Sequence, residues 1–281
     1  MFGQIASREA NYFLEEYMRN KFVGMLSLIM VLVVSLVVPT SVLAVTNGQP
    51  DGNGHPYVGV AIQFIPDMPG FVNVCSGTAL SPTVFLTAAH CFDPSLPVYV
   101  TYKSGPPLSL ANDFTEGTFY PDPDWCPECA SGLVGFDSHD VAIITLNEPV
   151  DPGGFGVLPS EGFVDTLPMG TAVDLVGYGV QGFVRGGGQP QQVFLFTRYY
   201  APTVLVQSNN RTSIEFIKLQ ANPSKGTGGT CFGDSGGPDL LGGTNIVLAV
   251  NSYVTNGNCA GVTYSNRVDL PDILEFINSF L

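Results

Sequence analysis

Glycine and proline interrupt this chain so often that long helices are excluded from most of it. The 281 residues include 33 Gly and 22 Pro, and both residue types break helices and favour turns. This composition favours many short strands joined by turns, which is typical of an all-β barrel or sandwich. The runs with strand character lie at residues 57–64, 98–102, 141–146, 172–176, 193–197, 214–219 and 246–250.

Charged residues are few, and acidic ones dominate. Ten Lys and Arg stand against 24 Asp and Glu, for a net charge of −14, while 45% of the residues are apolar. That apolar content can bury a core, which excludes a disordered polar chain. An acidic surface repels phosphate, so we expect no nucleic-acid partner.

The N-terminal region has the pattern of an export signal. Residues 22–38 form an apolar run, Arg19 and Lys21 precede it, and Val42-Leu43-Ala44 follows it. A basic start, an apolar middle and a Val-x-Ala end predict a secretory signal peptide that is cleaved after Ala44. We therefore expect residues 1–44 to be removed and the protein to be secreted.

Two alternatives remain open for this region. Residues 1–17 precede the basic segment as an extension, so Met18 is a second candidate for the first residue of the chain. Residues 22–44 are also long enough to cross a bilayer, and they would tether the protein to a membrane if they were retained.

Only the C-terminus has a helical pattern. Apolar residues that include Ile273 and Ile277 recur with helical spacing over residues 269–281, and Asp269 is a candidate N-cap. Glycine and proline crowd residues 149–160, which suits a crossing between two halves of the chain.

Three short strings carry the residue types of a nucleophilic hydrolase. They are TAAHC (87–91), DSHDVAII (137–144) and GDSGGP (233–238), and they place His90, Asp140 and Ser235 in that order. A serine hydroxyl attacks a carbonyl only when an imidazole removes its proton, and a carboxylate holds that imidazole in the required tautomer. Glycines beside the serine let the backbone approach the substrate and aim N–H groups at a developing oxyanion.

The order of these residues excludes two other hydrolase classes. An α/β-hydrolase needs a histidine after its nucleophile, but His55, His90 and His139 all precede Ser235. A zinc hydrolase of the H-E-x-x-H type is excluded because the sequence lacks that motif. His139 is interpreted as an ordinary loop residue.

The three strings, their order and their spacing resemble the chymotrypsin (trypsin-like) serine protease family, and the resemblance covers residues 45–281. It implies an all-β fold of two six-stranded antiparallel β-barrels, at about 45–155 and 156–268, followed by a C-terminal helix at 269–281.

The resemblance also assigns roles to individual residues. His90 matches the general base, Asp140 the carboxylate that orients it, and Ser235 the nucleophile of a serine endopeptidase. The backbone N–H groups of Gly233 and Ser235 match the oxyanion hole. Protein or peptide substrates, a monomer, and no metal or organic cofactor are implied. A non-catalytic homologue that uses the fold for binding is the competing class, although such proteins usually lose a triad residue.

In this family a freed apolar N-terminus folds inward and pairs with the aspartate before the nucleophile. The resemblance gives these roles to Val45 and Asp234, and the predicted signal cleavage falls directly before Val45. Because a buried ion pair is costly to break, we expect export itself to produce the active enzyme.

Six cysteines are expected to pair in an exported protein. The resemblance implies a Cys75–Cys91 disulfide beside the catalytic histidine and a Cys231–Cys259 disulfide beside the specificity pocket. The pair Cys126–Cys129 matches nothing in the family, and a local disulfide is favoured there over a metal site.

The resemblance places the specificity pocket at Gly229, Thr230, Ser252, Tyr253 and Val254. Trypsin-type members carry Asp where this chain has Gly229, so cleavage after Arg or Lys is disfavoured. Val254 stands where a glycine usually leaves room for large aromatic residues. We expect cleavage after small or medium apolar residues, with aromatic residues as the alternative.

Overall fold

A computed structural model describes residues 45–66, 68–126, 138–180, 182–184, 191–207 and 214–281. The expected export signal, the retained-anchor alternative and Cys129 lie outside these residues. Within the part of the chain that is described, no helix is long and apolar enough to cross a membrane.

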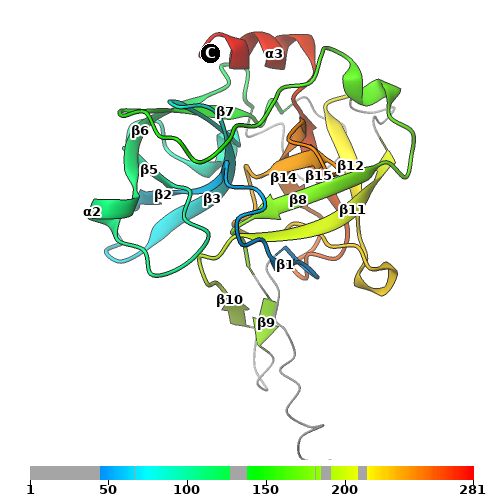
Figure 1. The fold of residues 1–281 in the computed structure, drawn as a ribbon, viewed down its shortest axis with the longest axis horizontal. Coiled ribbons are helices and arrows are strands. Elements are labelled where there is room, and N and C mark those ends of the chain that lie inside the picture. The colour runs from blue at the N-terminus through cyan, green and yellow to red at the C-terminus, as the bar shows by residue number, and fades with distance from the viewer. Residues whose placement is uncertain (1–44, 67, 127–137, 181, 185–190, 208–213) are drawn as a thin grey trace, which may run out of the picture. The chain divides into compact units, whose positions relative to one another are not determined.

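Six strands of the first half form a closed antiparallel barrel in the order β2-β3-β4-β7-β6-β5 (Figure 1). Strand β6 shows why they form a barrel wall, because Gly117 and Phe119 are buried while Glu116, Thr118 and Tyr120 are exposed. This period of two fits a sheet with one face against a core. The strands are β2 (Val58–Phe64), β3 (Val72–Ser81), β4 (Val84–Thr87), β5 (Val98–Thr101), β6 (Thr115–Pro121) and β7 (Ala142–Leu146).

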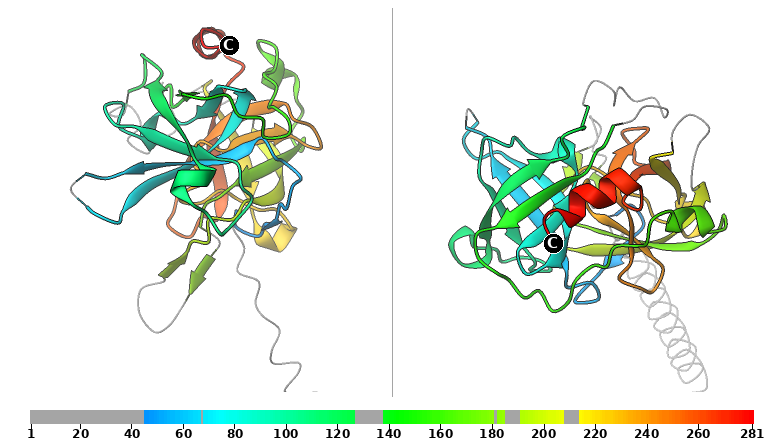
Figure 2. Two further views of the ribbon diagram at one scale, coloured as in Figure 1. Left: turned by 60° about the vertical axis from the view of Figure 1, so that its left-hand side comes forward. Right: turned by 90° about the horizontal axis from the view of Figure 1, so that it is seen from above.

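A second barrel lies beside the first (Figures 1 and 2). Its strands pair in the order β8-β13-β14-β15-β12-β11, and pairing of β11 with β8 closes it. The strands are β8 (Ala172–Gly177), β11 (Tyr199–Gln207), β12 (Phe216–Ala221), β13 (Pro238–Leu241), β14 (Val247–Val254) and β15 (Gly261–Arg267). The two closed six-stranded barrels confirm the fold class that the sequence predicts.

Short elements complete the two barrels. Strand β1 (Gln49–Pro50) pairs with β11 of the second barrel, although the sequence analysis grouped its residues with the first. Strands β9 (Gly182–Val184) and β10 (Gln191–Val193) form a separate hairpin. The remaining elements are the short helix α2 (Leu110–Asp113) and three 3-10 segments, η1 (Ala89–Cys91), η2 (Phe163–Thr166) and η3 (Pro223–Lys225).

The prediction of a strand at residues 193–197 is wrong. Strand β10 ends at Val193, and no strand follows until Tyr199. Phe196 has a φ of 50°, which is incompatible with extended backbone. The rings of Phe194 and Phe196 pack edge to face with centroids 4.6 Å apart, so these apolar residues contact each other instead of alternating across a sheet.

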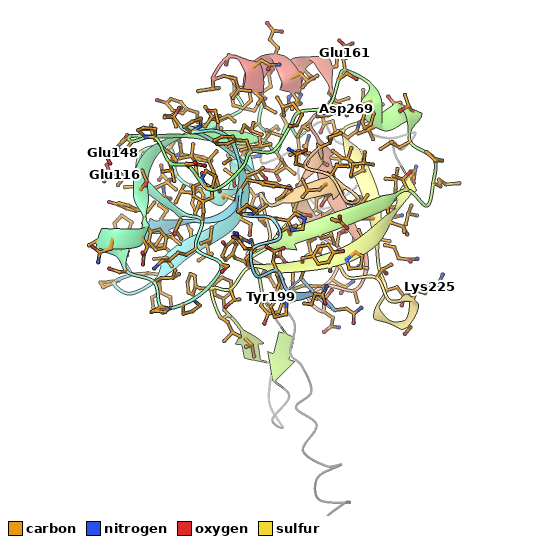
Figure 3. All side chains as sticks on the ribbon, viewed as in Figure 1. Glu116, Glu148, Glu161, Tyr199, Lys225 and Asp269 are labelled. Atoms are coloured by element: carbon orange, nitrogen blue, oxygen red, sulfur yellow. A yellow bond between two sulfur atoms is a disulfide. The ribbon has the colours of Figure 1, made fainter. Side chains whose placement is uncertain are left out.

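The C-terminal helix α3 (Pro271–Asn278) is shorter than the expected 269–281. Pro271 occupies its first turn, where a missing N–H leaves no hydrogen bond unmade. Asp269 does not cap the helix. Its carboxylate (Figure 3) instead accepts hydrogen bonds from Arg267 and from the backbone N–H of Val164.

Asp239 is an unusual residue for a barrel interior. It lies on β13, its side chain is fully buried, and neither carboxylate oxygen has a hydrogen-bond partner within 3.5 Å among the described residues. Burial raises the pKa of Asp239 to about 8, and the nearby Ser265 hydroxyl, which is not within that distance, offsets only part of the shift. The folded protein therefore holds this carboxyl in its neutral form at neutral pH.

Asp239 should make the protein less stable as the pH rises. The unfolded chain loses this proton near pH 3.8, whereas the folded protein keeps it up to about pH 8. The folded state thus binds one more proton between these values, and the free energy of unfolding falls with rising pH. We expect Asp239→Asn to remove about 1.4 kcal/mol of that fall per pH unit, measured by urea unfolding over this range.

Glu148→Gln is the matched control, because Glu148 is exposed at the periphery of the first barrel (Figure 3). An Asp239→Asn variant with the same pH dependence as the unmodified protein would contradict the prediction.

Candidate active site

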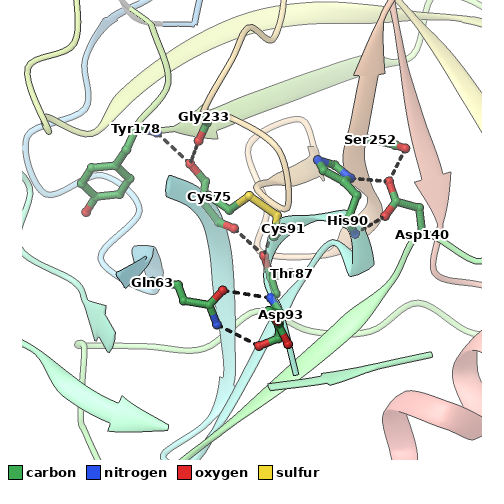
Figure 4. The surroundings of a disulfide bond; sticks show 11 residues. Gln63, Cys75, Thr87, His90, Cys91, Asp93, Asp140, Tyr178, Gly233 and Ser252 are labelled. Carbon is green, nitrogen blue, oxygen red and sulfur yellow. Dashed lines mark hydrogen bonds and ion pairs between the residues drawn. A yellow bond between two sulfur atoms is a disulfide. The ribbon is translucent and has the colours of Figure 1, made fainter. Parts of the chain in front are cut away.

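His90 stands in η1, immediately after strand β4. A disulfide joins its neighbour Cys91 to Cys75 on β3. The side-chain amide of Gln63 forms two hydrogen bonds with the backbone of Asp93: it donates to the Asp93 carbonyl and accepts from the Asp93 N–H (Figure 4). These contacts fix the turn, and the His90 side chain remains 38% exposed.

Asp140 holds His90 by two hydrogen bonds, one to the imidazole and one to the backbone (Figure 4). Its Oδ2 lies 2.8 Å from His90 Nδ1, and its Oδ1 accepts from the His90 backbone N–H at 3.0 Å. Two residues of the second barrel add to this arrangement. Ser252 Oγ donates to Asp140 Oδ2 at 2.5 Å, and the Asp140 N–H donates to Asn266 Oδ1 at 2.9 Å.

The charges of His90 and Asp140 depend on each other. Burial lowers the pKa of His90, but the charge and hydrogen bond of Asp140 raise it more, so it lies above the usual 6.5. Burial raises the pKa of Asp140, but His90 and Ser252 outweigh this effect and bring it below 3.8. At neutral pH the carboxylate is therefore ionised and favours protonation of the ring.

The turn that carries Ser235 is bound to the first barrel through Ser76. The Ser76 N–H donates to the Ser235 carbonyl at 2.8 Å, and Ser76 Oγ donates to the Gly233 carbonyl at 2.9 Å. Gly233 has a φ of +92°, a conformation that favours glycine. Among the described residues, the N–H groups of Gly233 and Ser235 donate to no other group, so both are available to a ligand.

A cavity of about 390 Å³ brings the expected catalytic residues together. Four of the five expected specificity residues also line it, whereas Gly229 does not and forms a bridge with Thr46 instead. The lining residues are His90, Trp125, Asp140, Thr230, Cys231, Phe232, Ser235, Asn251, Ser252, Tyr253 and Val254.

Asp234 lies fully buried next to Ser235 in the chain. Its oxygens accept the N–H groups of Gly179 and Cys231 at 2.8 and 2.9 Å. A side chain on Gly179 would overlap the Asp234 carboxylate. Burial raises the pKa of Asp234 to about 7, and no basic side chain in the described ranges pairs with it. Val45 is also fully buried.

Sequence reasoning missed several residues at this site. Trp125 lines the cavity. The sequence hinted at this segment only through the neighbouring Cys126, which has no counterpart in the family. Ser252 was assigned to the pocket alone, although it also binds Asp140. Nothing in the sequence pointed to Ser76 or Asn266, because each acts through a partner more than 100 residues away.

Two of the expected disulfides are present, Cys75–Cys91 and Cys231–Cys259. Cys129 lies outside the described residues, so the local Cys126–Cys129 disulfide stays a prediction.

Two closed antiparallel barrels, with a serine and a carboxylate-bound histidine at one cavity, are the arrangement of chymotrypsin-like serine proteases. Residues 47–274 match the trypsin family. The chain therefore belongs to that family and is a serine-type endopeptidase, with proteins or peptides as substrates.

Individual relatives agree with this assignment. The chain is 29% identical over 218 residues to the cercarial protease of Schistosoma mansoni, covering 72% of this chain and 74% of that protein. It is 28% identical over 201 residues to chymotrypsin-like elastase family member 1 of Canis lupus familiaris, and the match covers 66% of this chain and 72% of that protein.

The solved structures support the fold. HL collagenase matches with a TM-score of 0.64 at 18% identity, over 84% of this chain and 99% of that one. Human heparin binding protein matches with a TM-score of 0.60 at 16% identity, over 83% of this chain and 94% of that one.

The coupling of His90 to Asp140 can be measured directly. We expect the imidazole of His90 to titrate above 6.5 in an NMR experiment. In Asp140→Asn the charge that raises the pKa is lost while burial remains, so the pKa should fall below 6.5. His55→Gln and His139→Gln variants assign the three imidazole signals. A His90 pKa that does not move in Asp140→Asn would refute the coupling.

Proposed function

We propose that this chain is a secreted endopeptidase whose catalytic residues are His90, Asp140 and Ser235. The observation that carries the proposal is the geometry of His90. Its Nδ1 is hydrogen-bonded to the buried carboxylate of Asp140 at 2.8 Å. Nε2 is therefore the ring nitrogen that remains available to Ser235, which lines the same cavity.

The proposed reaction proceeds through an acyl-enzyme. Ser235 Oγ attacks the peptide carbonyl while His90 accepts its proton, and the charge of Asp140 stabilises the resulting imidazolium. The N–H groups of Gly233 and Ser235 bind the oxyanion. His90 then gives its proton to the leaving amine, and water hydrolyses the ester by the same steps in reverse.

The proposed activation step is the pairing of a free Val45 ammonium with Asp234. A fully buried carboxyl without a basic partner among the described residues supports it, as does the burial of Val45. Thr46 holds this segment on the second barrel through its bonds to Gly229 and Cys259. An ammonium next to Asp234 would restore its ionised form.

Secretion rests on the export signal before Val45 and on disulfides that persist outside the cytoplasm. A retained anchor would keep Val45 as an amide, which removes the ammonium that the activation step needs. We therefore favour cleavage after Ala44 and a soluble monomer.

A fluorophosphonate probe tests the catalytic proposal. We expect the chain that begins at Val45 to be labelled, and Ser235→Ala to be unlabelled with a kcat at least about 10³-fold lower. A chain that retains Ala44 should label weakly at neutral pH, because its Val45 nitrogen is uncharged. Folded protein that is never labelled would instead support a non-catalytic binding protein.

Specificity is proposed to be for small or medium apolar residues before the cleaved bond. Val254 and Tyr253 narrow the cavity with apolar surface, and the described lining residues include no carboxylate except that of Asp140. A peptide library should therefore show Ala, Val or Leu at this position, with aromatic residues as the alternative. Cleavage mainly after Arg or Lys would overturn both expectations, and Val254→Gly should shift the profile toward aromatic residues.

A further inference from the structure

We propose that Asp122, Asp124 and His139 form a binding site for one divalent transition-metal ion of the Zn²⁺ class. One ligand atom of each residue lies within 4.8 Å of the others. These residues take no part in the proposed triad, so the inference goes beyond the proposed function and does not depend on it.

The spacing of the atoms suits an ion better than a hydrogen bond. His139 Nδ1 and Asp122 Oδ1 are 3.7 Å apart, beyond hydrogen-bond distance. Two ligands that each bind a tetrahedral Zn²⁺ at about 2.1 Å lie about 3.4 Å from each other. Asp122 and His139 are buried while Asp124 is exposed, which gives the ion a route from solvent.

The second nitrogen of the His139 ring faces two further carboxylates. His139 Nε2 lies 3.7 Å from Asp272 Oδ2 and 3.9 Å from Glu215 Oε1, which is beyond hydrogen-bond distance. A ligating histidine usually donates its other N–H to a carboxylate, and we expect the exposed side chain of Asp272 to supply that acceptor when an ion binds. Glu215 is itself fixed, because its Oε2 accepts the Ser138 N–H at 2.7 Å.

The backbone holds the two ligand segments together. The Asp122 N–H donates to the Val141 carbonyl at 2.9 Å, and the Cys126 N–H donates to the Ser138 carbonyl at 3.2 Å. Asp122 Oδ1 accepts the Asp124 N–H at 2.9 Å, which folds that turn around the site. His139 has a φ of +44°, an uncommon conformation for histidine that clusters at functional sites.

The charge around His139 favours a cation. Among the described residues, four carboxylates, those of Asp122, Asp124, Glu215 and Asp272, lie around one imidazole. An imidazole with carboxylates suits Zn²⁺ and similar ions, whereas Ca²⁺ prefers oxygen ligands alone.

The position of this site connects it to the cleft. Asp140, which binds His90, follows His139 directly in the chain, and Trp125, which lines the cavity, follows Asp124. A bound ion would therefore join the two chain segments that supply the catalytic carboxylate and one wall of the cavity.

The test uses the chain that begins at Val45 with Ser235→Ala, which prevents self-cleavage and makes the result independent of catalysis. After treatment with EDTA, Zn²⁺ is added in calorimetric and thermal-unfolding titrations. We expect one equivalent to bind and the melting temperature to rise. His139→Asn should weaken binding at least about 10-fold, and so should Asp124→Asn, whose exposed position makes misfolding a poor explanation for the loss.

His55→Asn is the matched control, because it removes a different histidine bound to an aspartate; it should bind Zn²⁺ as tightly as the parent. Equal binding by the parent and His139→Asn would overturn the proposal. So would stabilisation by Ca²⁺ and not by Zn²⁺, or no response to either ion.

Discussion

The arrangement of His90 and Ser235 depends on the dipeptide Cys75-Ser76, which binds the second barrel through Ser76. The Cys75 disulfide fixes the turn of His90, and the hydrogen bonds of Ser76 fix the turn of Ser235. Acyl transfer tolerates errors of only a fraction of an ångström between base and nucleophile. Adjacent residues of strand β3 therefore hold the turn of His90 and the turn of Ser235. A movement of one barrel against the other would change the distance between these two turns, and the contacts of Cys75 and Ser76 resist it.

A buried ion pair connects the segment before β2 to the segment before β11. Arg198 is fully buried and binds Asp51 at 2.8 Å, and it also donates to the carbonyls of Val58, Tyr102 and Gly52. Burial raises the pKa of Asp51, but hydrogen bonds from His55 and Arg198 outweigh this and bring it to about 2. A buried pair is tolerable only when its hydrogen-bonding groups are satisfied. Here Arg198, directly before β11 of the second barrel, connects Asp51 and Gly52 to the carbonyls of Val58 and Tyr102 in the first half of the chain.

The sequence predicted those parts of the molecule that local patterns encode. His90, Asp140 and Ser235 stand in distinctive strings. The turn-bounded strand runs predicted an all-β barrel or sandwich, and the arrangement of two six-stranded barrels followed from the family resemblance. The sequence could not predict contacts that depend on closure of the barrels. Asp140 and Ser252 are 112 residues apart in the chain, and Asp269, a good N-cap candidate, is bound by Arg267 instead. His139 was interpreted as a loop residue because the four carboxylates that surround it among the described residues all come from other segments of the chain.

Asp140 shows how a buried charge can be stable in this protein. Its carboxylate accepts hydrogen bonds from the ring and backbone of His90 and from Ser252. Each of these donors offsets part of the cost of removing the carboxylate from water. The preceding residue, His139, lies among four further carboxylates of the described residues. Asp140 is therefore ionised because of its own hydrogen-bond donors and the neighbouring His90, and not because the region lacks other acidic groups.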